Sequence, residues 1–172
     1  MAKRISLREF QEKLVRQLAE AQTSERKTVL GVETDKESWL VDLTDTGEIL
    51  PVPQLAPVPL TRPWYRGIAN VRGTLYGVVD FSGFSNERLI PPGGSARLLV
   101  LSARHGTNCA LLFSRASGLR SVEDFEPAGG APDERPWVAG RLRDAQGKPW
   151  LKLDVRALIG HPAFLEAGVG TS

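Results

Sequence analysis

The sequence is poor in the features that mark secreted, membrane-spanning and metal-binding proteins. Cys109 is the only cysteine among 172 residues, so no disulfide can form within the chain, and a reducing compartment is expected. No apolar stretch approaches the roughly 18 residues that a transmembrane helix needs. The first 25 residues alternate charged and apolar side chains, which is not the pattern of a secretory signal. We therefore expect a cytoplasmic protein without membrane insertion.

Catalytic and ligand-binding motifs are also missing. The two histidines, His105 and His161, have no partner at metal-ligand spacing, so no metal site is predicted. Cys109 lies in an apolar run, where a thiol usually fills a core. Ser82 lacks the full Gly-x-Ser-x-Gly elbow, and Gly129-Gly130 opens no helix that would bind phosphate. The sequence predicts neither an enzyme nor a cofactor.

What the chain does contain is the composition of a globular domain, with 41% hydrophobic and 24% charged residues. The net charge of +2 is unevenly distributed. Residues 1–27 carry seven basic and four acidic side chains, a net +3, whereas the remainder of the chain is −1. Any positive field therefore lies on the N-terminal segment, and the body offers little attraction for nucleic acid.

An amphipathic helix is predicted near residues 7–22. Ser6 and Glu9 form a capping-box pattern, and Ile5 with Phe10 would supply the accompanying apolar contact. Apolar side chains recur every three or four residues on one face: Leu7, Phe10, Leu14, Leu18 and Ala21. We favour packing of this stripe on the protein's own body. The alternative is a helix that binds a partner or a second copy, since the segment is basic and terminal.

Short strands follow the helix. Antiparallel strand pairs are expected around three polar turns: 34–37, 104–107 and 144–147. Prolines spread between residues 51 and 63 exclude a long helix there. The polar run at residues 127–136 is expected to be a mobile loop, and Asp154 can cap a short helix from Val155 to Ile159.

A break in the strand pattern lies near residues 91–96, where two prolines precede two glycines. Many short strands with frequent turns are typical of small β-barrels or sandwiches, and the break predicts two of them. We therefore predict a helical extension at residues 1–27, one domain of two barrel subdomains at 28–163, and a tail at 164–172.

Residues 64–84 are the most informative segment. Trp64 to Arg66 is expected to be helical and to end at Gly67, and two strands then follow around an Arg72-Gly73 turn. The second strand ends at Asp80, whose carboxylate is expected to cap the next turn.

The Arg72-Gly73 turn is a candidate recognition element. Gly73 permits a backbone conformation that would hold Arg72 outward, and a guanidinium offers a planar fork to carboxylates. Taken alone, Arg72 is an ordinary surface arginine, and Asn70 is expected to cap the turn through its amide.

A barrel that binds single-stranded nucleic acid is the alternative function. Aromatic and cationic side chains are interleaved in this segment, as on such surfaces: Trp64, Tyr65 and Tyr76 with Arg62, Arg66 and Arg72. The net charge of −1 over residues 28–172 opposes this interpretation, because a nucleic-acid groove normally neutralises phosphates.

Four segments taken together carry a family resemblance: WLVDL at 39–43, GEI at 47–49, RGIANVRG at 66–73 and GVVDF at 77–81. They resemble the CheW-like adaptors of bacterial chemosensory arrays over roughly residues 28–160. The most specific part is the Asn70-x-Arg72-Gly73 turn with Asp80 beyond it. Pro149-Trp150 and Phe164-Leu165 add a similarity to the PilI-type members, which serve type IV pilus (twitching) systems.

The resemblance implies two small five-stranded SH3-like β-barrels, with an N-terminal helix and short connecting helices. It implies a non-catalytic adaptor between the cytoplasmic tip of a methyl-accepting chemoreceptor and the regulatory domain of a CheA-like histidine kinase. Such an adaptor is cytoplasmic and is recruited to membrane receptor arrays. A regulatory module of the kinase itself is a weaker alternative, because the chain has no phosphoacceptor helix and no ATP-binding motif.

The resemblance also implies positions for two contact sites. The receptor-binding residues would be Thr46, Glu48, Arg66, Gly67, Asn70 and Arg72. The kinase-binding residues would be Leu43 and Leu75 at one end of a barrel.

Overall fold

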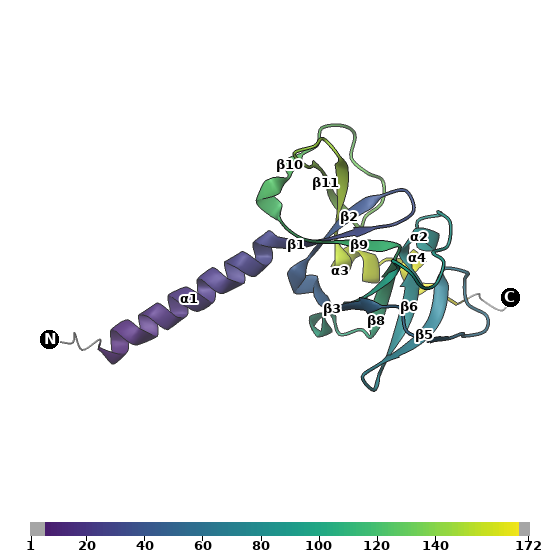
Figure 1. Ribbon diagram of the computed structural model, residues 1–172, viewed down its shortest axis with the longest axis horizontal. Helices are drawn as coiled ribbons and strands as arrows, with labels where there is room; N and C mark the ends of the chain where they lie inside the picture. The colour runs from purple at the N-terminus through teal and green to yellow at the C-terminus, as the bar shows by residue number, and fades with distance from the viewer. Residues whose placement is uncertain (1–5, 169–172) are drawn as a thin grey trace.

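The computed structural model of the chain describes residues 6–168, except for the side chains of 21–27, and shows a long helix, α1 (Leu7–Lys27), joined to a β-rich body (Figure 1). Sheet A contains, in spatial order, β10 (Glu126–Pro127), β11 (Val138–Arg143), β12 (Pro149–Leu153), β2 (Ser38–Asp42), β1 (Thr28–Glu33) and β9 (Arg115–Ser121). Sheet B contains β3 (Thr46–Pro51), β7 (Arg97–Leu101), β8 (Cys109–Phe113), β6 (Thr74–Asp80), β5 (Tyr65–Val71) and β4 (Leu55–Ala56).

Short helices connect the strands. They are α2 (Phe81–Phe84), α3 (Val155–Ile159), α4 (Pro162–Leu165) and the 3₁₀ turns η1 (Leu43–Asp45), η2 (Ala103–His105) and η3 (Val122–Asp124). The expected fold class is confirmed, because the protein is mainly β and built from two sheets with short connecting helices. Each sheet has six strands where five were expected, since each carries a two-residue edge strand, β10 or β4.

The two sheets are interleaved along the chain. β1 and β2 belong to sheet A, β3 to β8 form all of sheet B, and β9 to β12 return to sheet A. The break expected near residues 91–96 therefore does not separate the sheets, because the strands on either side of it, β6 and β7, both belong to sheet B. The chain crosses between the sheets at η1 and again at Ser114, between β8 and β9.

The three expected hairpins are present as antiparallel pairs, β1–β2, β7–β8 and β11–β12. Two parallel pairs, β12 with β2 and β6 with β8, join strands that are distant in sequence. The expected helix caps also form. The side chain of Asp154 accepts a hydrogen bond from the backbone N–H of Ala157, and that of Asp80 accepts one from Gly83.

The apolar residues form three cores. One is enclosed by each curled sheet, and a larger one lies between the two sheets. Leu98 and Val100 of β7 belong to the core inside sheet B, whereas Leu99 and Leu101 belong to the core between the sheets. β8 alternates in the same way, and this two-residue period places both faces of these strands in apolar surroundings. Burial on both faces explains why the two strands read as continuous apolar runs.

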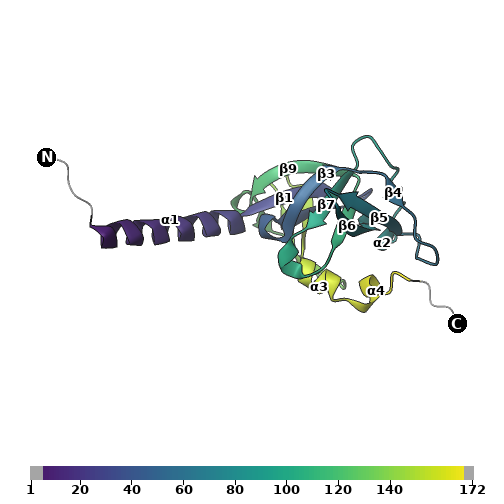
Figure 2. The ribbon, with the colours of Figure 1, turned by 90° about the horizontal axis from the view of Figure 1, so that it is seen from below.

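Helix α1 does not pack its apolar stripe on the body, so the packing that we favoured from the sequence is wrong. All residues from Ser6 to Glu20 are exposed, and the main contacts of α1 with the body are to η1 and β1 at its C-terminal end (Figure 2). The physical reason is the junction: Lys27 ends the helix and Thr28 starts β1 without a turn, so the helix cannot fold back.

The N-terminal cap of α1 forms as expected. The backbone N–H of Glu9 donates to Ser6 Oγ at 3.2 Å, and the N–H of Ser6 donates to Glu9 Oε2 at 3.3 Å. Ile5, the expected partner of Phe10, lies outside the described residues. Within residues 6–168, no helix combines the length and apolarity that crossing a bilayer requires.

Candidate partner-binding surface

The turn between β5 and β6 is rigidly built and presents Arg72. Arg72 and Gly73 both have positive φ, 53° and 86°, as the central residues of a type I′ hairpin turn require. Asn70 Oδ1 accepts a hydrogen bond of 2.9 Å from the N–H of Gly73, so the expected cap of the turn is present. The turn therefore fixes the backbone position from which the Arg72 side chain extends.

Arg72 pairs with Glu48 across the two ends of sheet B. Its Nη2 lies 2.7 Å from Glu48 Oε1, and the Arg72 side chain is 80% exposed. Glu48 belongs to β3, the first strand of the sheet, whereas Arg72 follows β5, near the opposite end. A contact between such distant strands shows that sheet B curls until its ends meet. Thr46, at the start of β3, is half-buried and donates its hydroxyl to the carbonyl of Asp42.

Arg66 and Gly67, two other expected contact residues, lie inside the fold. Arg66 Nη1 donates to Asp80 Oδ2 at 2.9 Å and to the carbonyl of Ile90 at 2.8 Å. Gly67 is buried in β5 with φ of 123°, so the predicted helix over residues 64–66, with its stop at Gly67, is wrong. This segment is a strand because it pairs with both β6 and β4.

The Arg66–Asp80 contact depends on a β-bulge that the sequence did not reveal. Counting outward from the Arg72-Gly73 turn would pair Arg66 with Val79, as it pairs Gly67 with Val78. The register instead shifts between Gly67 and Tyr65, so Tyr65 pairs with Val79 and Arg66 is left over at the bulge, from where it reaches Asp80. Asp80 is fully buried and also accepts from the N–H groups of Gly83 and Ile90.

The two expected kinase-contact leucines lie in different parts of the fold. Leu75 of β6 is 56% exposed and lines an open hollow of about 550 Å³ next to β4 and β5. The hollow is lined by Pro53, Gln54, Leu55, Ala56, Ile68, Asn70 and Leu75. Leu43 lies in η1, where the chain crosses between the sheets, and is half-buried. Asn70 therefore shares a surface with Leu75, and this surface adjoins Arg72.

The aromatic residues near the turn are not arranged as a stacking platform for bases. Trp64 packs edge-on against Phe84, with ring centroids 5.1 Å apart, and stacks on Phe164. Tyr65 is partly buried against the core between the sheets, and Tyr76 against the core inside sheet B. These rings contribute to packing, which weakens the nucleic-acid interpretation.

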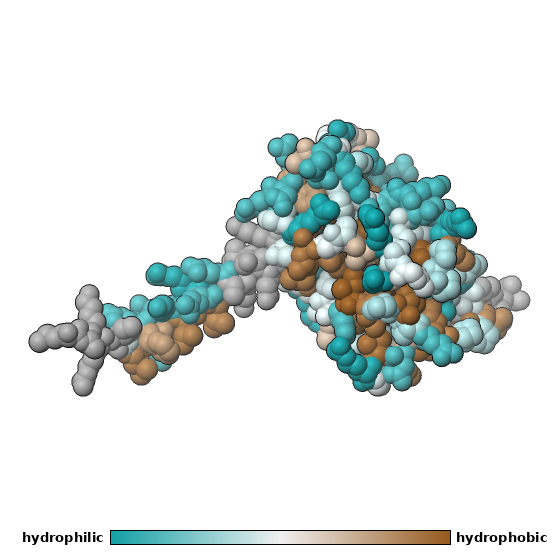
Figure 3. Space-filling model, viewed as in Figure 1, coloured by the Kyte–Doolittle hydropathy of each residue, from teal (hydrophilic) through white to brown (hydrophobic). Residues whose placement is uncertain are grey.

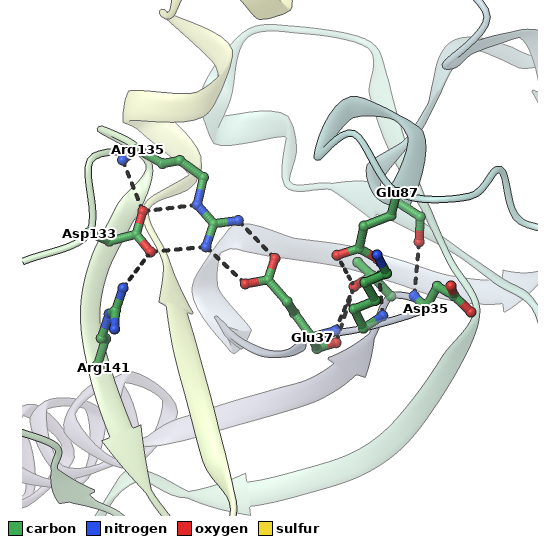
Figure 4. Close-up of polar contacts among 9 residues, drawn as sticks. Asp35, Glu37, Glu87, Asp133, Arg135 and Arg141 are labelled. Atoms are coloured by element: carbon green, nitrogen blue, oxygen red, sulfur yellow. Dashed lines mark hydrogen bonds and ion pairs between the residues drawn. The ribbon is translucent and has the colours of Figure 1, made fainter.

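A second hollow lies on sheet A, beneath the loop that was expected to be mobile. It measures about 420 Å³, and an ion-pair network lies at its wall (Figure 4). Arg135 forms two hydrogen bonds with Glu37, of 2.8 and 2.9 Å, and also bonds to Asp133, which accepts from Arg141. These bonds tie the loop to the β1–β2 turn, so the loop is anchored through its arginine.

The network makes stability dependent on pH. The hydrogen bond from Arg135 holds the pKa of the Asp133 carboxyl far below its usual range. A depressed folded-state pKa means that the stabilisation is present above the unfolded pKa of about 4 and is lost as pH falls below it. We expect Asp133→Asn to lower the urea midpoint at pH 7, and the difference from wild type to shrink between about pH 4 and pH 2.

Asp124→Asn is the matched control, because Asp124 is an exposed carboxylate in η3. Its urea midpoint should stay close to that of wild type at every pH. A difference between wild type and Asp133→Asn that stays constant down to pH 2 would show that Asp133 is not held ionised by Arg135.

Cys109, His105 and His161 were considered above for catalysis or metal binding, and their contacts indicate structural roles instead. Burial raises the pKa of Cys109 to about 12, which leaves its thiol protonated and unreactive. His105 Nε2 lies 2.9 Å from Asp45 Oδ1, and His161 Nδ1 accepts from the N–H of Ala163 at the start of α4. Over the described part of the chain, no three His, Cys, Asp or Glu side chains converge as metal ligands. The arrangement around Arg72 suits recognition.

The sequence and fold of this chain are similar to those of known proteins. The family model of the CheW-like domain matches residues 28–163. The chain is 28% identical to Protein PilI of Pseudomonas aeruginosa over 137 residues. The aligned region covers 76% of this chain and 74% of PilI. Its fold is similar to the crystal structure of the scaffolding protein TtCheW from Thermoanaerobacter tengcongensis, with a TM-score of 0.67 and 16% sequence identity. That alignment covers 80% of this chain and 95% of the other.

Proposed function

Because this chain belongs to the CheW-like domain family, we propose that it is a non-catalytic adaptor that couples a methyl-accepting chemoreceptor to a CheA-like histidine kinase. The likeness to PilI supports type IV pilus (twitching) motility as the output of the array. In this proposal the protein is cytoplasmic and is recruited to receptors at the membrane. Residues 28–163 form the adaptor domain, 1–27 a helical extension, and 164–172 a tail.

The observation that carries the proposal is the Arg72–Glu48 pair on a rigid turn. Arg72 is oriented by the turn and by Glu48, so little side-chain freedom is lost when a partner binds. Its guanidinium retains free donors for a carboxylate or for the carbonyls at a helix end. Contact residues for the receptor are then Arg72, Glu48, Asn70 and Thr46, while Arg66 and Gly67 support the turn from inside.

The hollow beside Leu75 is the proposed kinase contact. It is concave and mostly apolar, and it adjoins the Arg72 face, so a receptor helix and a kinase domain can lie side by side on sheet B. Leu43 is then outside this contact and supports the crossing between the sheets.

Replacing Arg72 by alanine should weaken receptor binding by about 10-fold or more, as loss of a central arginine often does at interfaces. Stability should change by less than about 0.5 kcal/mol, because the lost ion pair is exposed. Alanine and arginine both carry a Cβ, so strain at the positive φ stays the same. Titration of the receptor's cytoplasmic fragment by calorimetry, beside urea unfolding, measures both effects.

Arg141→Ala is the control, since Arg141 is also exposed and ion-paired but lies on sheet A. Binding of the kinase regulatory domain provides the internal reference and should be retained by the Arg72 variant. Unchanged receptor affinity in that variant would remove Arg72 from the contact. Failure of the wild-type protein to bind either fragment would reject the adaptor function.

A further inference from the structure

Helix α1 presents an apolar stripe that no other described part of this chain covers. Its large apolar side chains are 43% to 74% exposed: Leu7, Phe10, Leu14, Val15 and Leu18. In Figure 3 the apolar atoms of the helix gather along one side, and the opposite side is polar. Figures 1 and 2 show the helix extending away from both sheets.

Most of the stability of a helix in a protein comes from the packing of its apolar face, and the apolar face of α1 lacks such packing within the described chain. The 21 residues of α1 span about 31 Å at 1.5 Å per residue, and only one end touches the body. Clustered exposed apolar side chains of this kind usually mark an interaction surface. The stripe therefore needs an occupant from outside the body.

The charges of the helix favour a second copy as that occupant. Over Leu7–Lys27 the helix carries five cations and four anions, a net charge of only +1: Arg8, Lys13, Arg16, Arg26 and Lys27 with Glu9, Glu12, Glu20 and Glu25. A helix that lies on an anionic membrane is instead rich in cations on its polar face. A net charge this small allows two identical helices to approach with little net repulsion.

We propose that α1 pairs with α1 of a second copy in an antiparallel two-helix contact. Lys13 and Glu20 lie seven residues apart, so they occupy the same flank of the stripe on successive heptads. When two identical helices pair antiparallel, equivalent flanks face each other. Lys13 of each copy then lies opposite Glu20 of the other, and the two-fold symmetry makes this ion pair twice.

The register set by these charges also fits the length of the helix. The midpoint between Lys13 and Glu20 lies between Arg16 and Gln17, and residue 17 is the centre of Leu7–Lys27. The two helices then overlap along their full length, with Leu14 and Leu18 near the middle and the two bodies at opposite ends. A parallel pair would place Lys13 against Leu18, without a charge partner.

The contact is small, because it involves one helix from each copy. Small interfaces usually dissociate at micromolar concentrations. Sedimentation of the full chain from about 1 to about 100 µM should therefore show a shift from 18.8 kDa to twice that mass. Leu14→Glu should abolish the shift, whereas Arg16→Glu, on the opposite side of the helix, should retain it.

Charge reversal tests the direction of pairing. Lys13→Glu and Glu20→Lys should each weaken dimerisation by about 10-fold, since each places like charges together at both symmetric contacts. The double variant K13E/E20K should restore it, because the pairs are exchanged. Circular dichroism and the melting temperature of the body check that each variant is folded.

Three results would overturn the proposal. The chain could remain monomeric up to 100 µM, the double variant could fail to regain dimerisation, or Leu14→Glu could leave the mass unchanged. Binding of a monomeric chain to vesicles of phosphatidylglycerol and phosphatidylethanolamine, with loss on Leu14→Glu, would assign the stripe to a membrane surface instead.

Discussion

Replacing Asp80 by alanine is expected to lower the free energy of unfolding by about 3–5 kcal/mol, the usual cost of removing one partner of a buried ion pair. The carboxylate is fully buried and accepts three hydrogen bonds. Its loss leaves the Arg66 guanidinium, itself only 20% exposed, without a counter-charge. The N–H groups of Gly83 and Ile90 also lose their acceptor, and an unsatisfied buried donor carries its own penalty.

Asp154→Ala is the matched control for this prediction. Asp154 caps α3 as Asp80 caps α2, but no ion pair joins it in the described structure. Loss of a cap alone costs about 0.5–2 kcal/mol. Urea unfolding should therefore rank Asp80→Ala well above Asp154→Ala. Equal losses would mean that Asp80 acts only as a cap.

A second substitution separates the ion pair from the cap. Arg66→Met in the Asp80→Ala background removes the uncompensated charge and should recover part of the lost stability. No recovery would place the cost on the N–H groups of Gly83 and Ile90. The comparison also tests whether Arg66 belongs to the interior, because a residue that served only as a partner contact would not couple to Asp80.

The sequence was sufficient for local features and insufficient for contacts between distant strands. The caps at Ser6, Asp80 and Asp154 form as predicted, because each depends on residues within four positions. The hairpins form for the same reason. By contrast, Arg72 and Glu48 are 24 residues apart and meet only because sheet B curls. No local sequence pattern predicts the curvature of sheet B.

Helix α1 shows a different limit of sequence reasoning. Its periodic apolar positions correctly predicted a helix with one apolar face, but periodicity cannot say what covers that face. The direct junction of Lys27 to Thr28 decided the outcome, because it holds the stripe away from the body. The sequence prediction ended this helix near residue 22, whereas it continues to Lys27, so the direct junction with β1 was found only in the structure.

Gly67 was misinterpreted because a glycine after Trp64–Arg66 is typical of a helix end. A glycine is needed at this position because β4, a strand of two residues that pairs with β5, lies close to it. A Cβ at Gly67 would lie 2.3 Å from the carbonyl oxygen of Ala56 and 3.2 Å from Pro57 Cα. Glycine at position 67 therefore allows the backbones of β4 and β5 to lie close together, and this contact is seen only in the folded sheet.

Gly67→Ala is accordingly expected to destabilise the protein by about 2–4 kcal/mol, since backbone overlap and a φ of 123° both oppose a side chain. Backbone atoms of β4 cannot rotate away as a flexible side chain can, so β4 must shift or detach from β5. Gly140→Ala is the control: it lies in β11 with open space around it and no positive φ, and its effect should stay within about 0.5 kcal/mol.

Gly73→Ala separates the two causes, because Gly73 has a positive φ of 86° and nothing within 4 Å of its Cβ position. It should cost about 1 kcal/mol, the strain alone. If Gly67→Ala matched Gly73→Ala in urea unfolding, the overlap with Ala56 would be relieved at no cost, and β4 would be loosely held. A larger loss at Gly67 instead makes β4 part of the rigid support beneath Asn70 and the Arg72 turn, so the interior glycine determines how firmly the contact face is held.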